Sequence, residues 1–249
     1  MKSYNSNNVY YKIISILLLF IIWEVLFFII GNKNIFPSFL MVLNSIKFFL
    51  SNKLFYLSLL NTTLSSVLSF FLAFCISILI VYISYISLFF NSFIHTLMNV
   101  LKSFPIASFT ILFIIWIKST HLPLAVSFFM TLPIIYEVMI SGIKKVDSGL
   151  IESAEIQNIS KTKIYFCIIL FNIKGAIIGS LNATVSVAFK STVAAEVIAL
   201  IGKSIGNSLY ESKIFFDVDK VFAITFILIV VIKLVELLLN YIINKIIKP

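Results

Sequence analysis

Residues 54–101, LFYLSLLNTTLSSVLSFFLAFCISILIVYISYISLFFNSFIHTLMNVL, decide the fold of this chain, because these 48 residues carry no carboxylate and no amine. His95 is their one ionisable imidazole. At about 1.5 Å per residue, a straight helix of this length would be much longer than a bilayer is thick. The stretch therefore predicts apolar membrane helices with a break between them, which we expect around Ser84–Ser87 or Asn91–Ser92.

The composition of the whole chain agrees with that prediction. Of the 249 residues, 61% are hydrophobic and 12% are charged, whereas an average soluble domain is about half apolar and about a quarter charged. Because a helix satisfies its backbone hydrogen bonds internally, apolar runs of this length predict an all-α, polytopic membrane protein. No repeat and no linker interrupts residues 1–249, so we expect a single transmembrane domain. Its six expected spans are residues 13–30, 57–83, 105–117, 122–143, 175–201 and 221–243.

The net charge of +9 rests on 19 lysines, which are scattered over the loops between apolar segments. They form no basic face with interleaved aromatic residues, so we favour the positive loops of a membrane protein over nucleic-acid binding. Six spans place both termini on one side of the cell membrane. If that side is the cytoplasm, seven lysines lie in outer loops and ten in inner ones, in agreement with the positive-inside rule. The inner lysines are Lys2, Lys12, Lys102, Lys144, Lys145, Lys161, Lys163, Lys174, Lys245 and Lys248.

Isolated cysteines and histidines argue against two kinds of site. Cys75 and Cys167 are far apart in apolar surroundings, so they support neither a disulfide framework nor a metal site. His95 and His121 have no partner at the spacing that metal ligands need. We therefore expect no metal and no cofactor.

Two short patterns resemble enzyme motifs but lack the residues that the chemistry needs. Gly202-Lys203-Ser204 resembles the end of a phosphate-binding loop, but Val197 stands where that loop requires glycine. The carboxylates of Glu152 and Glu155 have no nucleophile or metal-binding partner beside them. We expect this chain to bind no ATP and to have no catalytic site.

The most polar interior stretch is residues 147–163, DSGLIESAEIQNISKTK, between the fourth and fifth expected spans. Asp147 or Ser148 can cap a short helix there, and Glu152 falls in its first turns, where a carboxylate suits the helix dipole. Such a helix, lying parallel to the membrane with an apolar and acidic surface, suits docking to a soluble partner. An ordinary amphipathic loop helix is the alternative that periodicity alone favours.

Within this stretch, Glu152-Ser153-Ala154 resembles the EAA motif of ABC-transporter permease subunits. Further short pieces, from about Ile13 to the C-terminus, follow the order expected of the nitrate/sulfonate/taurine-type permeases. Because each piece is short, their order and spacing carry the resemblance. The pieces are Phe36-Pro37-Ser38, Ser103-Phe104-Pro105-Ile106, Leu132-Pro133-Ile134, Val146-Asp147, Leu150-Ile151-Glu152-Ser153-Ala154, Val193-Ala194-Ala195-Glu196 and Asp219-Lys220-Val221-Phe222-Ala223.

The resemblance implies the membrane-spanning subunit of an ATP-driven importer for a small solute. Sulfonates, nitrate and vitamin precursors are the candidate cargoes. It further implies three partners: a separate ATP-binding subunit, a second permease subunit, expected to form a homodimer, and an extracytoplasmic substrate-binding protein. In that family the loop docks in a cleft of the ATPase subunit, and the matching positions here are Glu152, Ser153, Ala154 and Asn158.

Three positions depart from the family pattern. Asn158 stands where the family usually has glycine, and asparagine tolerates a left-handed backbone better than most residues. Leu170-Phe171 lacks the proline that usually follows the coupling loop, and Ser153 replaces an alanine. We expect the fold to tolerate these changes, while they weaken the expectation that coupling follows the usual pattern.

The fifth expected span begins with small residues at helical spacing. Gly175, Gly179 and Ala183 form a small-xxx-small pattern, which lets two helices approach closely in lipid. The partner helix belongs either to the other permease half or to the same subunit, and the sequence does not separate the two.

Two ionisable residues follow in that span. Lys190 is a candidate for lining the pathway and attracting an anion, or for pairing with a carboxylate elsewhere, or for snorkelling. Glu196 belongs to the family's Ala-Ala-Glu and is expected near the outer end of the span. Lys233 and Glu236 are three residues apart, so we expect them to pair on one helix face.

Two rival functions are open to a protein of this composition. An ion-coupled secondary transporter would use Lys190 and Glu196, but such folds show matching halves, which this chain lacks. A membrane-embedded enzyme would need a polar cluster that two isolated histidines do not supply. We rank both below the importer subunit.

Overall fold

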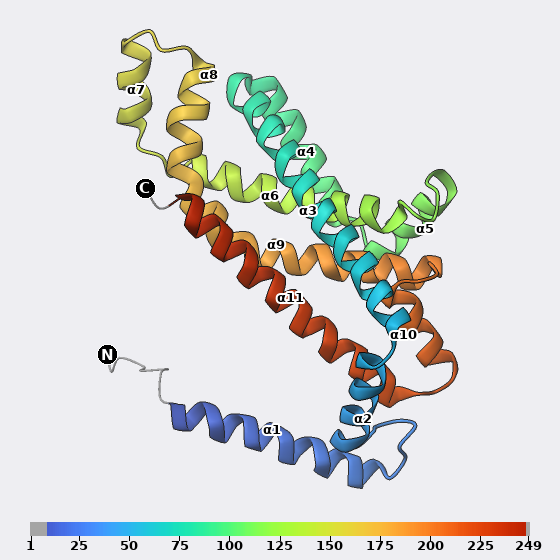
Figure 1. Ribbon diagram of the computed structural model, residues 1–249. Coiled ribbons are helices and arrows are strands. Elements are labelled where there is room, and N and C mark those ends of the chain that lie inside the picture. The colour runs from blue at the N-terminus through green and yellow to red at the C-terminus, as the bar shows by residue number, and fades with distance from the viewer. Residues whose placement is uncertain (1–8, 248–249) are drawn as a thin grey trace.

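The computed structural model describes residues 9–247, and within them every regular element is a helix (Figure 1). The prediction of an all-α polytopic membrane protein is confirmed. Five of the described helices are long and apolar enough to cross a membrane, and one bent pair raises the number to six. In chain order the elements are α1 (Val9–Ile30), α2 (Phe39–Leu50), α3 (Lys53–Ile86), α4 (Leu88–Ser103), α5 (Ile106–Trp116), α6 (Leu122–Ile143), α7 (Ser148–Ile156), α8 (Lys161–Lys163), the π-helix η1 (Ile164–Ile169), α9 (Leu170–Ala199), α10 (Ile205–Ile214) and α11 (Val218–Ile247).

The long apolar stretch breaks at Ser87, within one of the two places that its length requires. Ser87 has an extended backbone, and its hydroxyl accepts a hydrogen bond from the N–H of Phe90 at the start of α4. The preceding helix, α3, packs through small hydroxyl residues, which allow close approach of neighbouring helices. Its buried hydroxyl residues are Ser58, Thr62, Ser66, Ser69, Ser77 and Ser84.

The core lies where α3, α6 and α9 pack together, and a chain of hydroxyl groups joins them. Ser69 on α3 lies 2.6 Å from the Ser127 hydroxyl on α6, and Ser127 donates to the carbonyl of Ala188 on α9 at 2.9 Å. The largest buried side chains of the core include Tyr136 and Phe189. Buried polar groups in lipid need such partners, so these bonds fix how the three helices pack.

The third expected span, 105–117, differs from the structure. Its α5 has 11 residues, about 17 Å of helix, whereas the hydrocarbon core is about 30 Å thick. It forms a bent pair with α4, at an angle of 101°. Pro105 explains the bend, because it has no N–H to donate and its ring clashes with the preceding helical turn. Only together are α4 and α5 long and apolar enough to cross a membrane.

The fifth expected span, 175–201, also differs from the structure. The helix already begins at Lys161 and continues through η1 and α9 to Ala199, with no break at Lys174 or Gly175. A glycine within a helix costs only about 1 kcal/mol, so it does not interrupt a helix that packs along its length.

The molecule has two distinct ends (Figure 1). At one end α7 and α8 extend beyond the bundle, and at the other lie α2 and α10. The N-terminal helix α1 extends away from the bundle and is fixed at its α2 end: Trp23 donates to the carbonyl of Pro37 at 3.1 Å, and Glu24 accepts from the N–H of Phe39 at 3.0 Å. Of the inner-side lysines, Lys2 and Lys248 lie outside the described residues.

Candidate functional site

The polar stretch between α6 and α9 forms a capped helix, as its sequence predicts. Asp147 accepts a hydrogen bond from the N–H of Gly149 at 2.9 Å, and so caps α7. At the other end Asn158 has a left-handed backbone, with φ of 54°, and the N–H of Ile159 closes the turn on the carbonyl of Ala154 at 3.0 Å. Asparagine thus holds the position where the resembled family has glycine.

The two faces of α7 differ in exposure. Ala154 is buried against the bundle, whereas Glu152, Ser153 and Glu155 are exposed. Two apolar side chains of this helix are also exposed, Leu150 by 48% and Ile156 by 81%. The end of the molecule that α7 occupies therefore carries a small surface with both acidic and apolar groups.

Two tyrosines join this loop to the bundle, and the sequence analysis did not identify them. Tyr165 in η1 donates to the carbonyl of Ile78 on α3 at 2.8 Å. The Tyr82 hydroxyl lies 2.8 Å from that of Thr162 in α8, and the rings of Tyr82 and Tyr165 are 5.2 Å apart. An available signal was that a tyrosine occurs within each of two apolar segments, α3 and the segment that follows the loop.

The loop meets the long helix α9 through six residues of π-helix, Ile164–Ile169. This is the segment just before Leu170-Phe171, where the resembled family has proline. A π-helix is rare and marks an inserted residue in the helical repeat, often at a functional site. Here it turns Ile164, Tyr165 and Ile169 into the core.

Glu196 is held by hydrogen bonds at the far end of α9. Its carboxylate is 2% exposed. The Thr62 hydroxyl of α3 lies 2.9 Å from both carboxylate oxygens, and the N–H of Gly206 donates to Oε2 at 3.0 Å. The N–H of Ile205 in turn donates to the Thr62 hydroxyl at 3.0 Å. Glu196 thus joins α3, α9 and the first turn of α10.

Close backbone packing surrounds this carboxylate. A Cβ atom added to Gly206 would lie 2.3 Å from Cβ of Glu196 and 2.7 Å from the backbone nitrogen of Val197. Two left-handed residues, Leu200 and Lys203, turn the chain between α9 and α10. The position therefore requires glycine for space, a need that the sequence pattern did not reveal.

The structure does not bring Lys190 and Glu196 together. Lys190 is exposed on α9, and no ion pair to it occurs within the described residues, whereas Glu196 is buried. Lys190 shares its exposed face with Gly175, Gly179 and Ala183, since these positions recur at helical spacing. The two glycines have open space around them, so this stripe packs against no helix of the described chain.

Among the described residues, two pairs of oppositely charged residues occur on the long helices and α4. Lys233 and Glu236 lie 3.0 Å apart, as their spacing predicts. Lys102, counted above among the inner-loop lysines, instead lies within α4 and pairs with Glu137 of α6 at 2.6 Å. The reason is that α4 continues to Ser103 before Pro105 stops it.

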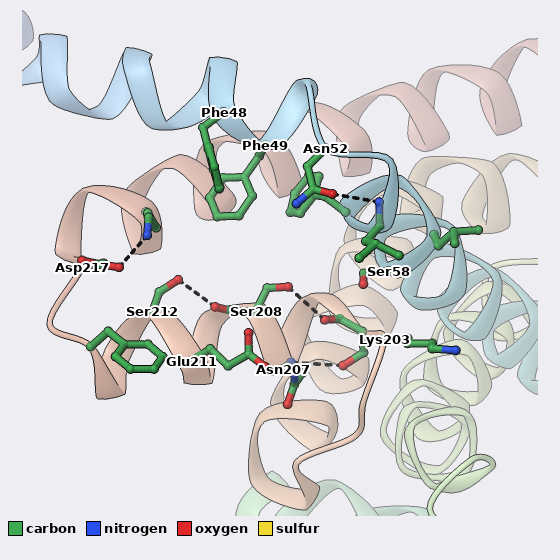
Figure 2. A pocket seen from close by; sticks show the side chains of 16 residues that line it. Phe48, Phe49, Asn52, Ser58, Lys203, Asn207, Ser208, Glu211, Ser212 and Asp217 are labelled. Atoms are coloured by element: carbon green, nitrogen blue, oxygen red, sulfur yellow. Dashed lines mark hydrogen bonds and ion pairs between the residues drawn. The ribbon is translucent and has the colours of Figure 1, made fainter.

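A pocket of about 470 Å³ opens at the end opposite α7. In Figure 2, Phe48 and Phe49 of α2 and Ser58 of α3 face the polar residues of α10, which include Asn207 and Ser208. Three charged groups in its wall, Glu211, Asp217 and Lys220, have partners.

Those partners are local to the pocket. Asp217 pairs with Lys220 at 2.6 Å, and Asn207 donates to Glu211 at 2.6 Å. Across the described residues no group of three or more histidine, cysteine or carboxylate side chains could hold a metal ion.

A family model described as "Binding-protein-dependent transport system inner membrane component" matches residues 76–248. None of the curated proteins matches the chain.

Proposed function

We propose, from the premise that this chain belongs to the family of binding-protein-dependent transport system inner membrane components, that two copies of it enclose the translocation path of an ABC importer. The family makes the chain a permease component, a transport subunit embedded in the membrane. The proposal adds that an ATP-binding subunit docks on α7, that an external binding protein delivers the solute at the opposite end, and that both termini are cytoplasmic.

The observation that carries this proposal is the position and anchoring of α7. It extends beyond the bundle with Glu152 and Ile156 exposed, while Ala154 and the Tyr82–Tyr165 pair fix its base to α3 and α9. A rigid base and an uncovered tip suit a helix that transmits force from a soluble partner. ATP-driven closure of the partner would move α7, and through η1 reorient α9.

The second copy is proposed to pack on the small-residue face of α9. Gly175, Gly179 and Ala183 are exposed in the single chain, and small residues allow two helices to approach closely in lipid. Of the two packing partners left open by the sequence, the arrangement favours another subunit, because this face meets no helix of the described chain.

The external binding protein is proposed to contact the end that carries α2 and α10. The pocket there has aromatic and hydrogen-bonding walls and opens on the side of the molecule away from α7. An ATPase on α7 and a binding protein at this end would face opposite sides of the membrane, as import requires: the solute is delivered outside and released into the cytoplasm. Sulfonates, nitrate and vitamin precursors stay the candidate cargoes.

The alternative of an ion-coupled secondary transporter has less support. It would need Lys190 and Glu196 in one ion-binding site, whereas Lys190 is exposed and Glu196 is buried with its own hydrogen-bond donors. It would also leave the exposed tip of α7 without a partner.

Co-purification tests the proposal. The full-length chain is extracted in detergent together with candidate ATP-binding subunits from its source, and Glu152→Lys is compared with Glu211→Lys. Both carboxylates are exposed, but Glu211 lies on α10 at the opposite end. We expect the native chain and Glu211→Lys to retain the ATPase subunit and Glu152→Lys to lose it. Equal retention by both variants would remove α7 from the coupling surface, and no retention by the native chain would contradict the importer.

A further inference from the structure

Helix α4 has three faces of different chemistry. One face packs on the bundle through Ile94 and Met98, which are nearly fully buried. A second face is exposed and apolar, with Phe93, Leu97 and Val100, and suits contact with lipid. The third face is polar and consists of Asn91, Ser92, His95, Thr96, Asn99 and Ser103.

The polar face borders two cavities that join along the helix. One, of about 490 Å³, lies between the end of α3, α4 and the end of α6 and includes His95 and Lys144. The other, of about 530 Å³, continues along α4 to Phe104 and Pro105. Thr96 lines both cavities, so a continuous polar surface leads from the α7 end of the bundle to the break between α4 and α5.

The break itself supports contact with water. Phe104 and Pro105 have extended backbones between two helices that together form one bent crossing. Non-helical backbone at membrane depth is tolerated only where protein covers it or where it lines a water-filled cavity. In this chain both residues are exposed and border the second cavity.

In the part of the chain that the structure describes, one charged pair and one unpaired cation border this face. Lys102, at the end of α4, forms an ion pair with Glu137 at 2.6 Å, whereas Lys144, at the end of α6 in the first cavity, forms no ion pair within the described residues. Along α4 itself the groups left to meet a solute are amides, hydroxyls and an imidazole, and the His95 ring lies 3.2 Å from the Asn99 amide. Such groups bind by donating and accepting hydrogen bonds.

We propose that the polar face of α4 is a wall of the translocation path, and that the solute is recognised along α4 by hydrogen bonds. The inference rests on the proposed function, because it presumes that a second subunit closes the path. Lipid cannot cover the polar face without loss of its hydrogen bonds, whereas water and a polar solute satisfy them. Lys190, which is on α9, then lies outside the polar face of α4 that recognises the solute.

Cysteine labelling tests the wall. Cys75 and Cys167 are replaced by alanine, and Asn99→Cys is compared with Leu97→Cys in membranes that contain the full-length chain. The two positions are two residues apart and both exposed, but Asn99 is on the polar face and borders the second cavity, whereas Leu97 is on the apolar face and borders neither cavity. We expect a water-soluble methanethiosulfonate to modify Asn99→Cys about tenfold faster or more, because lipid shields Leu97 from the reagent. Equal rates would overturn the assignment of this face.

Two further measurements test this inference separately from the proposed function and from the solute class. The cysteine variants are also tested for retention of the ATP-binding subunit: retention with equal labelling rates would leave the importer in place and move the path away from α4. Neutral hydroxyethyl and anionic sulfonatoethyl reagents are then compared at Asn99→Cys, with rates normalised to a free thiol. Recognition by hydrogen bonds predicts that the neutral reagent reacts at least as fast. A preference of about tenfold for the anion would overturn recognition by hydrogen bonds, because such a preference needs a net positive charge in the path. Its loss in Lys144→Gln would identify that charge as Lys144.

Discussion

At the scale of single residues, the corner between α9 and α10 depends on one carboxylate and one glycine. Glu196 is buried and has no basic partner in the described residues, so its hydrogen bonds to Thr62 and Gly206 replace those that it makes in water. Because Gly206 has no side chain, its own N–H can approach the Glu196 carboxylate closely enough to donate a hydrogen bond. Loss of either partner therefore disturbs three helices at once.

Gly206→Ala is expected to destabilise the protein by about 1–3 kcal/mol, because the new methyl group would overlap backbone and side-chain atoms of Glu196 and Val197. The measurement is the thermal unfolding midpoint of the purified chain in detergent. Gly202→Ala is the matched control, since a Cβ there would meet no atom within 4 Å. Equal midpoints for both variants would contradict the crowding seen at Gly206.

At the scale of elements, η1 connects the coupling loop to α9. Its Tyr165 hydroxyl reaches the carbonyl of Ile78, and the Tyr82 ring packs against it. Through this contact, motion at α7 can reach α3 as well as α9, which continues directly from η1. A helix with a π segment at the junction has a place to change its register without unfolding.

Tyr165→Phe is expected to keep the fold and to weaken coupling, because it removes the hydrogen bond to α3 but leaves the ring in place. We expect solute-independent ATPase activity of the assembled complex to change while ATPase retention on co-purification stays the same. A cost of about 1 kcal/mol in stability is expected for the lost hydrogen bond. Tyr241→Phe, at an exposed site on α11, is the control. Identical ATPase activity in both variants would argue that the anchor plays no part in coupling.

At the scale of the whole molecule, a single chain leaves two surfaces of its membrane helices uncovered. The small-residue face of α9 and the polar face of α4 are both exposed, although each belongs to a membrane helix. A second copy would cover the first and enclose the second. Only the assembly, and not the single chain, would then satisfy both faces.

Gly179→Leu is expected to weaken the assembly without unfolding the subunit, because its surroundings within the chain are open but a second helix would clash with the larger side chain. The measurement is the mass of the complex in detergent. Gly202→Leu, which also has open space and lies outside α9, serves as control. An unchanged mass for Gly179→Leu would place the subunit contact elsewhere.

The sequence by itself determined the all-α membrane class, the break near Ser87, the cap at Asp147 and the Lys233–Glu236 pair. Each depends on properties that repeat along the chain: apolar length, turn and cap chemistry, and the spacing of residues on one helix face. The family of the chain could be proposed for the same reason, since the order of short motifs is a linear property. The roles assigned to Glu152, Lys190 and their neighbours stay predictions.

Tertiary structure alone decided the joint crossing of α4 and α5, the unbroken course of α9, the separation of Lys190 from Glu196, and the contacts of Thr62, Gly206 and Tyr165. These contacts join residues far apart in the chain; Thr62 and Glu196, for example, are separated by 134 positions. Which helices meet, and through which faces, depends on packing in three dimensions. Periodicity along one helix identifies its faces but not the helix that each face contacts.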